Sequence, residues 1–552
     1  MAPPRRHRAR IALAVLLLVL APAAATAVGG PVAVELPGSN PHPYAWIGYA
    51  VAQAGALVAV SSPENIDAVA THGIVDIYEC TPTPAGGRNC TLQTTLHGDD
   101  FARLFGISLA ATTVTTNGTA SEVPTATFAV GALEAYTPEF PPGSLGALYI
   151  FECAGPAPWT CRRAARLEPP AANIIEFGRA VAFFRSGLVV SAPYSLQQGA
   201  VLVYDCAPPL WDCLLRTQLI SSSVDRDYFG WSVAADGDRI VVGSVGEDIM
   251  AGAAYLFECL PRAPGCLTLS KLHAVGRRAE DYFGWSVGLS GMTVVASAPR
   301  ALQPQGPSNF GSAHLFACSP AAVNREEDGG VRPYAWECAE QVQLVADSRE
   351  PVYFADTVHI RGKRVTVSVE EGGHTSGSGG GTVSAGIYMY ECDTAVLPWR
   401  CERAARLVRT IPVTVKYVSH YQMAVAVAPD AIAVGCFEQS RHAAQFVGGA
   451  FLFSCSEGTP RRRADDVGGD AKPDYARCLP AGSPRRRHPH LQPQRHRGEP
   501  LTLQQCYEYV CTAHKYDKLS VAPVATSDGH AQELAYTAKE VTVEVPSCRV
   551  KQ

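Results

Sequence analysis

A repeated strand that ends in cysteine most constrains how this chain folds. An aromatic run that closes on Cys recurs along the chain, as in Gly252–Cys259 and Gly311–Cys318, at intervals of about 53 to 74 residues. Self-similarity at such a period is typical of repeat architectures, in which each repeat is one supersecondary unit. The strand-ending cysteines are Cys80, Cys153, Cys206, Cys259, Cys318, Cys392 and Cys455.

A second repeated element, Phe-Gly, precedes this strand within the same units. The stretches 227–233 and 281–287 both read Asp-Tyr-Phe-Gly-Trp-Ser-Val. The element is degraded at Phe354-Ala355 and barely visible in the first and last units. Glycine lets neighbouring backbones approach closely, so we interpret Phe-Gly as core, with the phenylalanine wedged between units. The clear examples begin at Phe105, Phe177, Phe229 and Phe283.

Four short runs of β-branched, aromatic and small apolar residues make up each unit, with turn residues between them. In the fourth unit the runs are Trp231–Ala235, Arg239–Gly243, Ala253–Cys259 and Leu267–Leu272. Four strands per repeat and seven repeats predict an all-β fold, a seven-bladed β-propeller of four-stranded blades with a short C-terminal extension. A β-helix has a far shorter repeat, and separate sandwiches need roughly 100 residues each.

These elements resemble the FG-GAP repeat family, which includes the N-terminal propeller of integrin alpha chains. The resemblance covers roughly residues 40–480 and implies a seven-bladed propeller with a role in adhesion or ligand recognition. In integrin-like members, several blades bind calcium in the hairpin between the first two strands, through a loop of D-x-D-x-D-G character. The matching hairpins here, residues 235–238, 289–292 and 361–364, are short and offer few carboxylates. We therefore expect no metal and no cofactor, with Asp236 and Asp238 as ordinary turn residues.

Cysteine pairs replace calcium as the bracing in this interpretation. Each pair flanks the turn between the third and fourth strands, where opposed hairpin residues lie within disulfide reach. Zinc is the rejected alternative, because its sites use closer C-x-x-C spacings. The predicted disulfides are Cys80–Cys90, Cys153–Cys161, Cys206–Cys213, Cys259–Cys266, Cys318–Cys338, Cys392–Cys401 and Cys455–Cys478. Cys506 with Cys511 and Cys436 with Cys548 is a guess by elimination.

Residues 1–27 have the pattern of a secretory signal peptide. A basic segment leads into the apolar run Ile11–Leu20 and the cleavage site Ala25-Thr26-Ala27. The run is shorter than the roughly 20 residues of a membrane span, so we expect a secreted, extracellular protein with no span after cleavage. The 18 cysteines suit an oxidising compartment. Glycosylation is predicted at Asn117 and, less favourably because a cystine adjoins it, at Asn89.

Composition divides the mature chain into three parts. Residues 28–456 hold the propeller, 457–499 a Pro/Arg-rich low-complexity insertion, and 500–552 a small strand-containing segment that is a candidate to close the ring. Charged residues make up 18 % and the net charge is −5, which gives no reason to expect nucleic acid as a partner.

The motifs contain no catalytic constellation, neither a G-x-S-x-G elbow nor an H-E-x-x-H pair, so we expect a protein that is not an enzyme. The leading hypothesis is a recognition or adhesion scaffold that binds an extracellular protein or cell-surface partner. Two alternatives stay open: a lectin-like propeller that binds carbohydrate, and a structural component of matrix or wall.

The second turn of each blade is the predicted binding surface. These turns, including residues 136–146, 300–311 and 371–386, are long and dissimilar, and loops on a rigid ring often carry recognition. Aromatic and Arg side chains supply most interface hot spots. The candidate partner-binding residues are Tyr136, Phe140, Arg300, Asn309, Phe310 and His374. Acidic pairs precede Phe-Gly, Asp225 with Asp227 and Glu280 with Asp281. We expect them to be solvated turn residues, the alternative being a charged rim for a cationic partner.

Overall fold

The computed structural model describes much of the chain between residues 33 and 454. The described ranges are 33–40, 45–66, 72–84, 87–99, 102–114, 125–133, 145–185, 187–206, 211–222, 226–261, 263–303, 309–320, 336–347, 352–371, 381–394, 397–413, 421–438 and 448–454. The predicted signal peptide and the segments 457–499 and 500–552 lie outside these ranges.

Antiparallel strands in runs of four dominate these residues, which confirms the all-β class. We name each run a unit and number it in chain order. Unit 1 contains β2 (Val51–Ala54), β3 (Leu57–Ile66), β4 (His72–Pro82) and β5 (Arg88–His97). Unit 2 contains β6 (Ser108–Val114), β7 (Thr125–Ala132), β8 (Ala147–Ala154) and β9 (Thr160–Leu167). Unit 3 contains β10 (Val181–Phe184), β11 (Gly187–Ala192), β12 (Ala200–Asp205) and β13 (Leu214–Leu219).

The later units follow the same order. Unit 4 contains β14 (Phe229–Asp236), β15 (Arg239–Ser244), the four-residue α1 (Glu247–Met250), β16 (Ala253–Glu258) and β17 (Leu267–Leu272). Unit 5 contains β18 (Val287–Ser290), β19 (Thr293–Leu302), β20 (Asn309–Pro320) and β21 (Trp336–Leu344). Unit 6 contains β22 (Val352–Arg361), β23 (Arg364–Glu371), β24 (Gly381–Asp393) and β25 (Arg400–Val413). Unit 7 contains β26 (Tyr421–Val427), β27 (Ala431–Glu438), β28 (Gly449–Ser454) and the N-terminal β1 (Ala33–Leu36).

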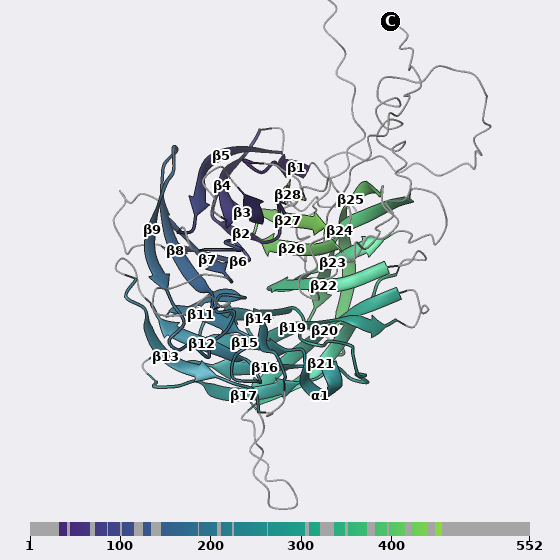
Figure 1. Cartoon of the computed structure of the whole chain (residues 1–552). Coiled ribbons are helices and arrows are strands. Elements are labelled where there is room, and N and C mark those ends of the chain that lie inside the picture. Colours follow the sequence, from purple (N-terminus) through teal and green to yellow (C-terminus); the bar gives the residue numbers. More distant parts are fainter. Residues whose placement is uncertain are drawn as a thin grey trace, which may run out of the picture.

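The units follow one another around a common centre, with β2 beside β26 where the order returns to its start (Figure 1). Neighbouring units share their apolar core: the second and third strands of unit 4 pack against β19 and Phe283 of unit 5. Units 5 and 6 also form one eight-stranded sheet, since β20 and β22 pair in parallel over two residues.

The Phe-Gly element holds adjacent units together, as its interpretation as core requires. Phe283 is fully buried, and its backbone forms a parallel bridge with Gly252 at the start of the third strand of unit 4. A Cβ at Gly252, where φ is +83°, would lie 2.1 Å from the Phe283 carbonyl oxygen. Only glycine allows both this backbone conformation and this approach. In unit 1, where the sequence motif is barely visible, Ile47 takes the place of the phenylalanine and bridges Gly448.

Disulfides join the third and fourth strands in six of the units. Six of the predicted pairs are present, and Cys455 with Cys478 lies outside the described residues. Cys153 and Cys161, for example, are opposed across β8 and β9 with their Cα atoms 4.0 Å apart. Among the four remaining cysteines only Cys436 is described, in β27.

Tryptophan two residues before the fourth-strand cysteine contacts the preceding unit. Trp159 donates from its indole Nε1 to Glu79 of unit 1 over 3.0 Å, and Trp211 donates to Glu152 of unit 2 over 2.7 Å. Glu79 and Glu152 each precede the third-strand cysteine. The disulfide therefore fixes a hairpin whose tip joins one unit to the next.

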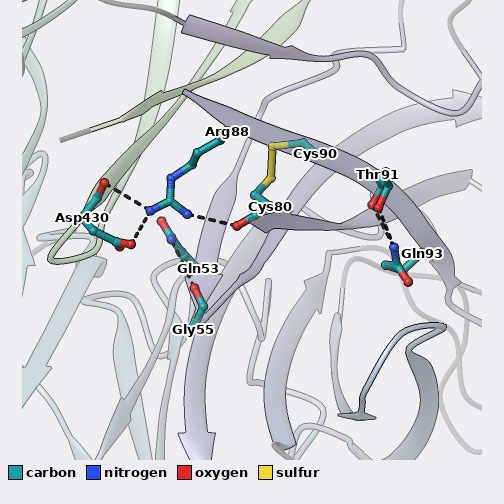
Figure 2. The surroundings of a disulfide bond; sticks show 8 residues. All are labelled: Gln53, Gly55, Cys80, Arg88, Cys90, Thr91, Gln93 and Asp430. Carbon is teal, nitrogen blue, oxygen red and sulfur yellow. Dashed lines mark hydrogen bonds and ion pairs between the residues drawn. A yellow bond between two sulfur atoms is a disulfide. The ribbon is translucent and has the colours of Figure 1, made fainter. Parts of the chain in front are cut away.

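Two contacts join residues from the beginning and the end of the described chain. β1 pairs antiparallel with β28, so the N-terminal strand completes the sheet of unit 7. Arg88, in the hairpin of the Cys80–Cys90 disulfide, donates 3.0 Å to the Cys80 carbonyl and forms an ion pair with Asp430 of unit 7 (Figure 2). The Arg88 side chain is 5 % exposed and that of Asp430 57 %, so the link is buried on the arginine side and open to solvent on the aspartate side.

The first turns of neighbouring units bind to one another. Asp236 accepts a hydrogen bond of 2.6 Å from the backbone N–H of Gly291 in the next unit, and Asp238 forms an ion pair of 3.3 Å with Arg185 of the preceding unit. These two residues thus have specific inter-unit partners beyond the ordinary turn role expected of them. Across the described residues, no group of three or more His, Cys, Asp or Glu is placed to hold a metal ion. No helix in the described ranges is long and apolar enough to cross a membrane.

Candidate functional site

In each unit, antiparallel pairing brings the second turn and the start of the first strand, which we call the inner strand, to the same end of the sheet. Phe229, at the start of β14, pairs with Ser244 at the end of β15, and the second turn of unit 4 follows directly. The next unit is tied to the same turn, because Phe283 donates its backbone N–H to Ala251 over 3.0 Å. We call this side, formed by second turns and inner-strand starts, the second-turn face.

Half-buried side chains flank the Phe-Gly element on the second-turn face. The residue before Phe-Gly has a positive φ in several units, 51° at Tyr228 and 57° at Tyr282, which turns its side chain away from the buried phenylalanine. The flanking residues of units 1, 3, 4, 5 and 6 are Trp46 and Tyr49, Glu176 and Arg179, Tyr228 and Trp231, Tyr282 and Trp285, and Tyr353 and Asp356.

A chain of ring contacts connects units 3 to 5 across this face. The guanidinium of Arg179 lies 4.9 Å from the Trp231 ring, whose centroid is 4.8 Å from that of Trp285. Trp285 meets Tyr282 edge to face at 5.9 Å, and Arg300 lies over Tyr282 at 4.8 Å. Aromatic and cation–π contacts of this kind hold the side chains in place while leaving them partly accessible.

Charged groups lie within the same cluster. Arg179 pairs with Glu176 at 3.5 Å. Burial raises the pKa of the Tyr49 hydroxyl; the positive charge of Arg179 lowers it and the negative charge of Glu176 raises it further. Tyr49 of unit 1 therefore interacts electrostatically with unit 3. Burial also raises the pKa of Asp356 to about 7, against a smaller lowering by Arg300. The cluster therefore combines flat apolar rings with charges of both signs.

Two of the predicted partner-binding residues join this cluster. Arg300 is exposed and stacks on Tyr282, and the ring of Phe310 stacks on Tyr353 of unit 6 at 5.9 Å with 12° between the planes. Asn309 lies in β20 and pairs with Val352. Tyr136, Phe140 and His374 lie outside the described residues. Of the predicted glycosylation sites, Asn89 is exposed on β5 and Asn117 is outside the described ranges.

Two of the acidic residues before Phe-Gly, Asp227 and Asp281, are buried, so for them the expectation of a solvated turn residue is wrong; Glu280 is exposed as expected, and Asp225 lies outside the described residues. Asp227 is 1 % exposed and accepts a hydrogen bond of 2.6 Å from Ser221. Asp281 is 8 % exposed and accepts 2.6 Å from the backbone of Arg278. Both carboxylates form hydrogen bonds within the segment that leads into the inner strand, and they are not available as a charged rim.

The second turn of unit 4 has an unusual backbone. Asp248, Ile249 and Met250 have φ of 51°, 58° and 62°, three consecutive left-handed residues without glycine. Each such residue costs roughly 1–2 kcal/mol relative to the right-handed conformation. The turn leaves the Ile249 side chain 80 % exposed. Its carbonyl accepts from Glu280, and that of Met250 accepts from Tyr282, so the turn is bound to the segment that enters unit 5.

A buried Ser-His-Glu chain in unit 5 belongs to the core. Ser312 Oγ lies 2.8 Å from His314 Nε2, and His314 Nδ1 lies 2.7 Å from a Glu340 oxygen. Ser312 is 1 % exposed and His314 2 %, so a substrate has no access to the hydroxyl. His314 stands four residues before Cys318, as Tyr255, which also hydrogen-bonds a carboxylate, stands before Cys259.

Tryptophan spacing is the sequence signal that separates structure from site. The chain has seven tryptophans. Trp159, Trp211, Trp336 and Trp399 occur as W-x-C in the third turns, whereas Trp46, Trp231 and Trp285 flank Phe-Gly or its equivalent. The interpretation of Phe-Gly as core assigned no role to the residues on either side of it, so it did not identify this second group.

Comparison with known proteins gives one family and several distant folds. No curated protein matches the chain. A putative 6-phosphogluconolactonase from Bacteroides uniformis is 11 % identical with a TM-score of 0.38, covering 68 % of this chain and 90 % of that one. The periplasmic gluconolactonase PpgL of Pseudomonas aeruginosa is 10 % identical with a TM-score of 0.37, covering 69 % and 92 %. Saccharomyces cerevisiae Sqt1 is 10 % identical with a TM-score of 0.35, covering 76 % and 97 %.

The family match falls on the units with the clearest motif. The model of the FG-GAP repeat matches residues 221–257 and 268–316, which span most of units 4 and 5. These matches confirm the resemblance seen in the sequence: units 4 and 5 of the chain contain FG-GAP repeats.

Proposed function

We propose that this protein is a secreted, non-enzymatic recognition or adhesion scaffold that binds a protein or cell-surface partner through its second-turn face. The observation that carries the proposal is the ring cluster of Trp231, Trp285 and Tyr282 with Arg179 and Arg300. Tryptophan, tyrosine and arginine are the residues that dominate interface hot spots. Their mutual contacts hold them in place before binding, which reduces the entropy lost on association.

We further propose that the scaffold is a closed, seven-bladed β-propeller. Support comes from the pairing of β1 with β28, which joins the two ends of the described chain, and from the ion pair of Arg88 with Asp430, which joins unit 1 to unit 7. The six disulfides suit the oxidising compartment that the signal peptide predicts. Two-dimensional class averages from electron cryo-microscopy test the blade number directly, since views along the axis show seven lobes if the proposal holds.

A lectin-like function is the second candidate, and the same cluster favours it. Tyr/Trp pairs flank the Phe-Gly position in units 1, 4 and 5, so an aromatic motif repeats around the face. Flat aromatic rings beside carboxylates such as Asp356 suit sugar rings as well as protein side chains. A glycan array separates the two: strong binding to one glycan class that Trp231→Ala abolishes favours the lectin.

The decisive experiment compares the two sides of the ring. The protein is purified from the medium of expressing cells and cross-linked to cell-surface proteins. Trp231→Ala/Trp285→Ala should remove the specific cross-links, whereas Met292→Ala, in the first turn of unit 5 and 41 % exposed, should leave them unchanged. If both variants are folded by circular dichroism and keep the cross-links, or lose them to the same extent, the partner does not bind at these tryptophans.

A further inference from the structure

The second-turn face of units 3 to 5 also carries exposed apolar side chains outside the ring cluster. Ile249 and Val275 are each 80 % exposed, Leu302 is 51 %, Ile220 47 % and Tyr194 42 %. Isolated exposed apolar residues are common, but several on one side of a ring mark an interaction surface.

Backbone hydrogen bonds join the loops that carry these residues. The carbonyls of Ile249 and Met250 accept from the segment after Val275, and Arg277 of that segment forms an ion pair with Asp248. The ring of Tyr194 contacts Tyr228 at 5.3 Å, which connects the second turn of unit 3 to unit 4. The apolar residues therefore stand on neighbouring, mutually braced loops.

Positive charge surrounds the apolar residues in this part of the face. The side chains of Arg226, Arg278 and Arg300 are exposed, whereas the acidic Asp227, Asp281 and Glu247 beside them are buried. Of the described acids that remain accessible there, Asp248 is paired with Arg277 and Glu176 with Arg179, which leaves Glu280. This local excess of positive charge contrasts with the net charge of −5 of the whole chain.

We propose that Ile249 is the apolar anchor of a docking surface for an acidic protein segment, with Arg226, Arg278 and Arg300 pairing with its carboxylates. This inference rests on the proposed recognition function and names the partner's chemistry. The left-handed turn makes sense in this role, because it projects a β-branched side chain into solvent from a rigid ring. The complementary charges predict binding that weakens as salt rises.

A peptide-display selection on the immobilised, disulfide-bonded protein tests the proposal. We expect enriched peptides to combine Asp or Glu with an apolar residue and to lose at least tenfold in affinity for Ile249→Asp. Leu397→Asp is the matched control, because Leu397 is 79 % exposed in a third turn, at the opposite end of the strands. It should bind the peptides like the wild type.

Ile249→Gly separates binding from folding. Glycine adopts the left-handed conformation without penalty, so this variant should melt no lower than the wild type and yet lose the same affinity. Peptides that bind wild type and Ile249→Asp equally, or no enrichment at all, would overturn the inference. If binding depends on Trp231 and Trp285 but not on Ile249, the inference fails while the proposed function stands. A dimer in sedimentation that Ile249→Asp dissociates would show that a second copy is the occupant, and would overturn it too.

Discussion

The indole rings of Trp231 and Trp285 lie 4.8 Å apart, centroid to centroid, and join units 4 and 5 on the second-turn face. Both rings are half-buried, in contrast to Trp159, which is 8 % exposed and donates a hydrogen bond to Glu79. One residue type therefore has two roles in this protein. The tryptophans of the third turns fasten the units together, and those beside Phe-Gly present an aromatic surface.

This division predicts unequal costs of truncation. Trp159→Ala should destabilise the protein by about 3 kcal/mol, since it removes a buried ring and leaves Glu79 without its donor. Trp159→Phe, which keeps a buried aromatic ring but loses the indole N–H and part of the ring volume, should cost less, about 1–2 kcal/mol. Trp231→Ala should cost less than Trp159→Ala in denaturant unfolding. A larger cost for Trp231 would assign that ring to the core.

Glycine substitutions test the junction between units. Gly252→Ala introduces a Cβ 2.1 Å from the Phe283 carbonyl oxygen at a φ of +83°, so it should cost several kcal/mol, about 1–3 of them from overpacking. Gly291→Ala is the control, because that glycine has a φ of +58° with nothing within 4 Å of the new Cβ. It should cost only roughly 1 kcal/mol. Similar melting temperatures for the two variants would contradict the close approach.

The elements that repeat are the ones that sequence reasoning predicted well. In unit 4 the predicted strands agree with β14 to β17 to within two residues, because turn residues and β-branched runs mark each end. The six described disulfides follow from opposed positions on hairpins. Tertiary burial is harder to predict, and Asp227 shows why: a carboxylate before a turn is usually solvated, but here Ser221 folds over it. The pairing of β1 with β28 joins strands more than 400 residues apart in the sequence, and no local pattern reveals it.

Asp356 predicts a pH dependence of stability. Burial raises its pKa from 3.8 to about 7, so between these values the folded state holds a proton that the unfolded state releases. The free energy of unfolding is therefore highest with respect to this group below about pH 4. It falls as pH rises to 7, and the total loss is at most about 4 kcal/mol. Asp356→Asn should therefore be more stable than the wild type at pH 8, with the difference shrinking toward pH 4.

His359 also makes stability depend on pH, so the effect of Asp356 has to be measured as the difference between the wild type and Asp356→Asn. Burial lowers its pKa to about 4, so the unfolded state binds the extra proton and stability rises with pH from about 4 to 6.5. This slope opposes that of Asp356 and is shared by both proteins, so it cancels in their difference. A constant difference in unfolding free energy from pH 4 to 8 would contradict a raised pKa at Asp356.

Metal removal should have little effect on the ring. The first turns bind to one another through pairs such as Asp236 with Gly291, where integrin-like relatives hold calcium. EDTA should shift the melting temperature by no more than about 2 °C, because no calcium-bound state is lost. Asp236→Ala should lower the free energy of unfolding by about 1 kcal/mol, which denaturant unfolding resolves better than melting, since in a protein of more than about 250 residues it moves the melting temperature by less than about 2 °C. A large drop in EDTA that calcium restores would show that a cation braces these turns.

Disulfide removal should depend on what each hairpin holds. In the loop-entropy model, the loop between Cys259 and Cys266 contributes about 2.5 kcal/mol, as does the similar loop between Cys153 and Cys161. The second hairpin also carries Trp159, whereas the first has no tryptophan. Variants in which both cysteines of one pair are replaced by Ser should thus differ. The Cys153–Cys161 variant should lose more stability, because the indole contact with Glu79 loosens as well.

Adding Trp159→Phe to each variant provides the test. Its cost should be smaller in the variant without Cys153–Cys161, and unchanged without Cys259–Cys266. Equal costs in both backgrounds would mean that the disulfide and the tryptophan act independently.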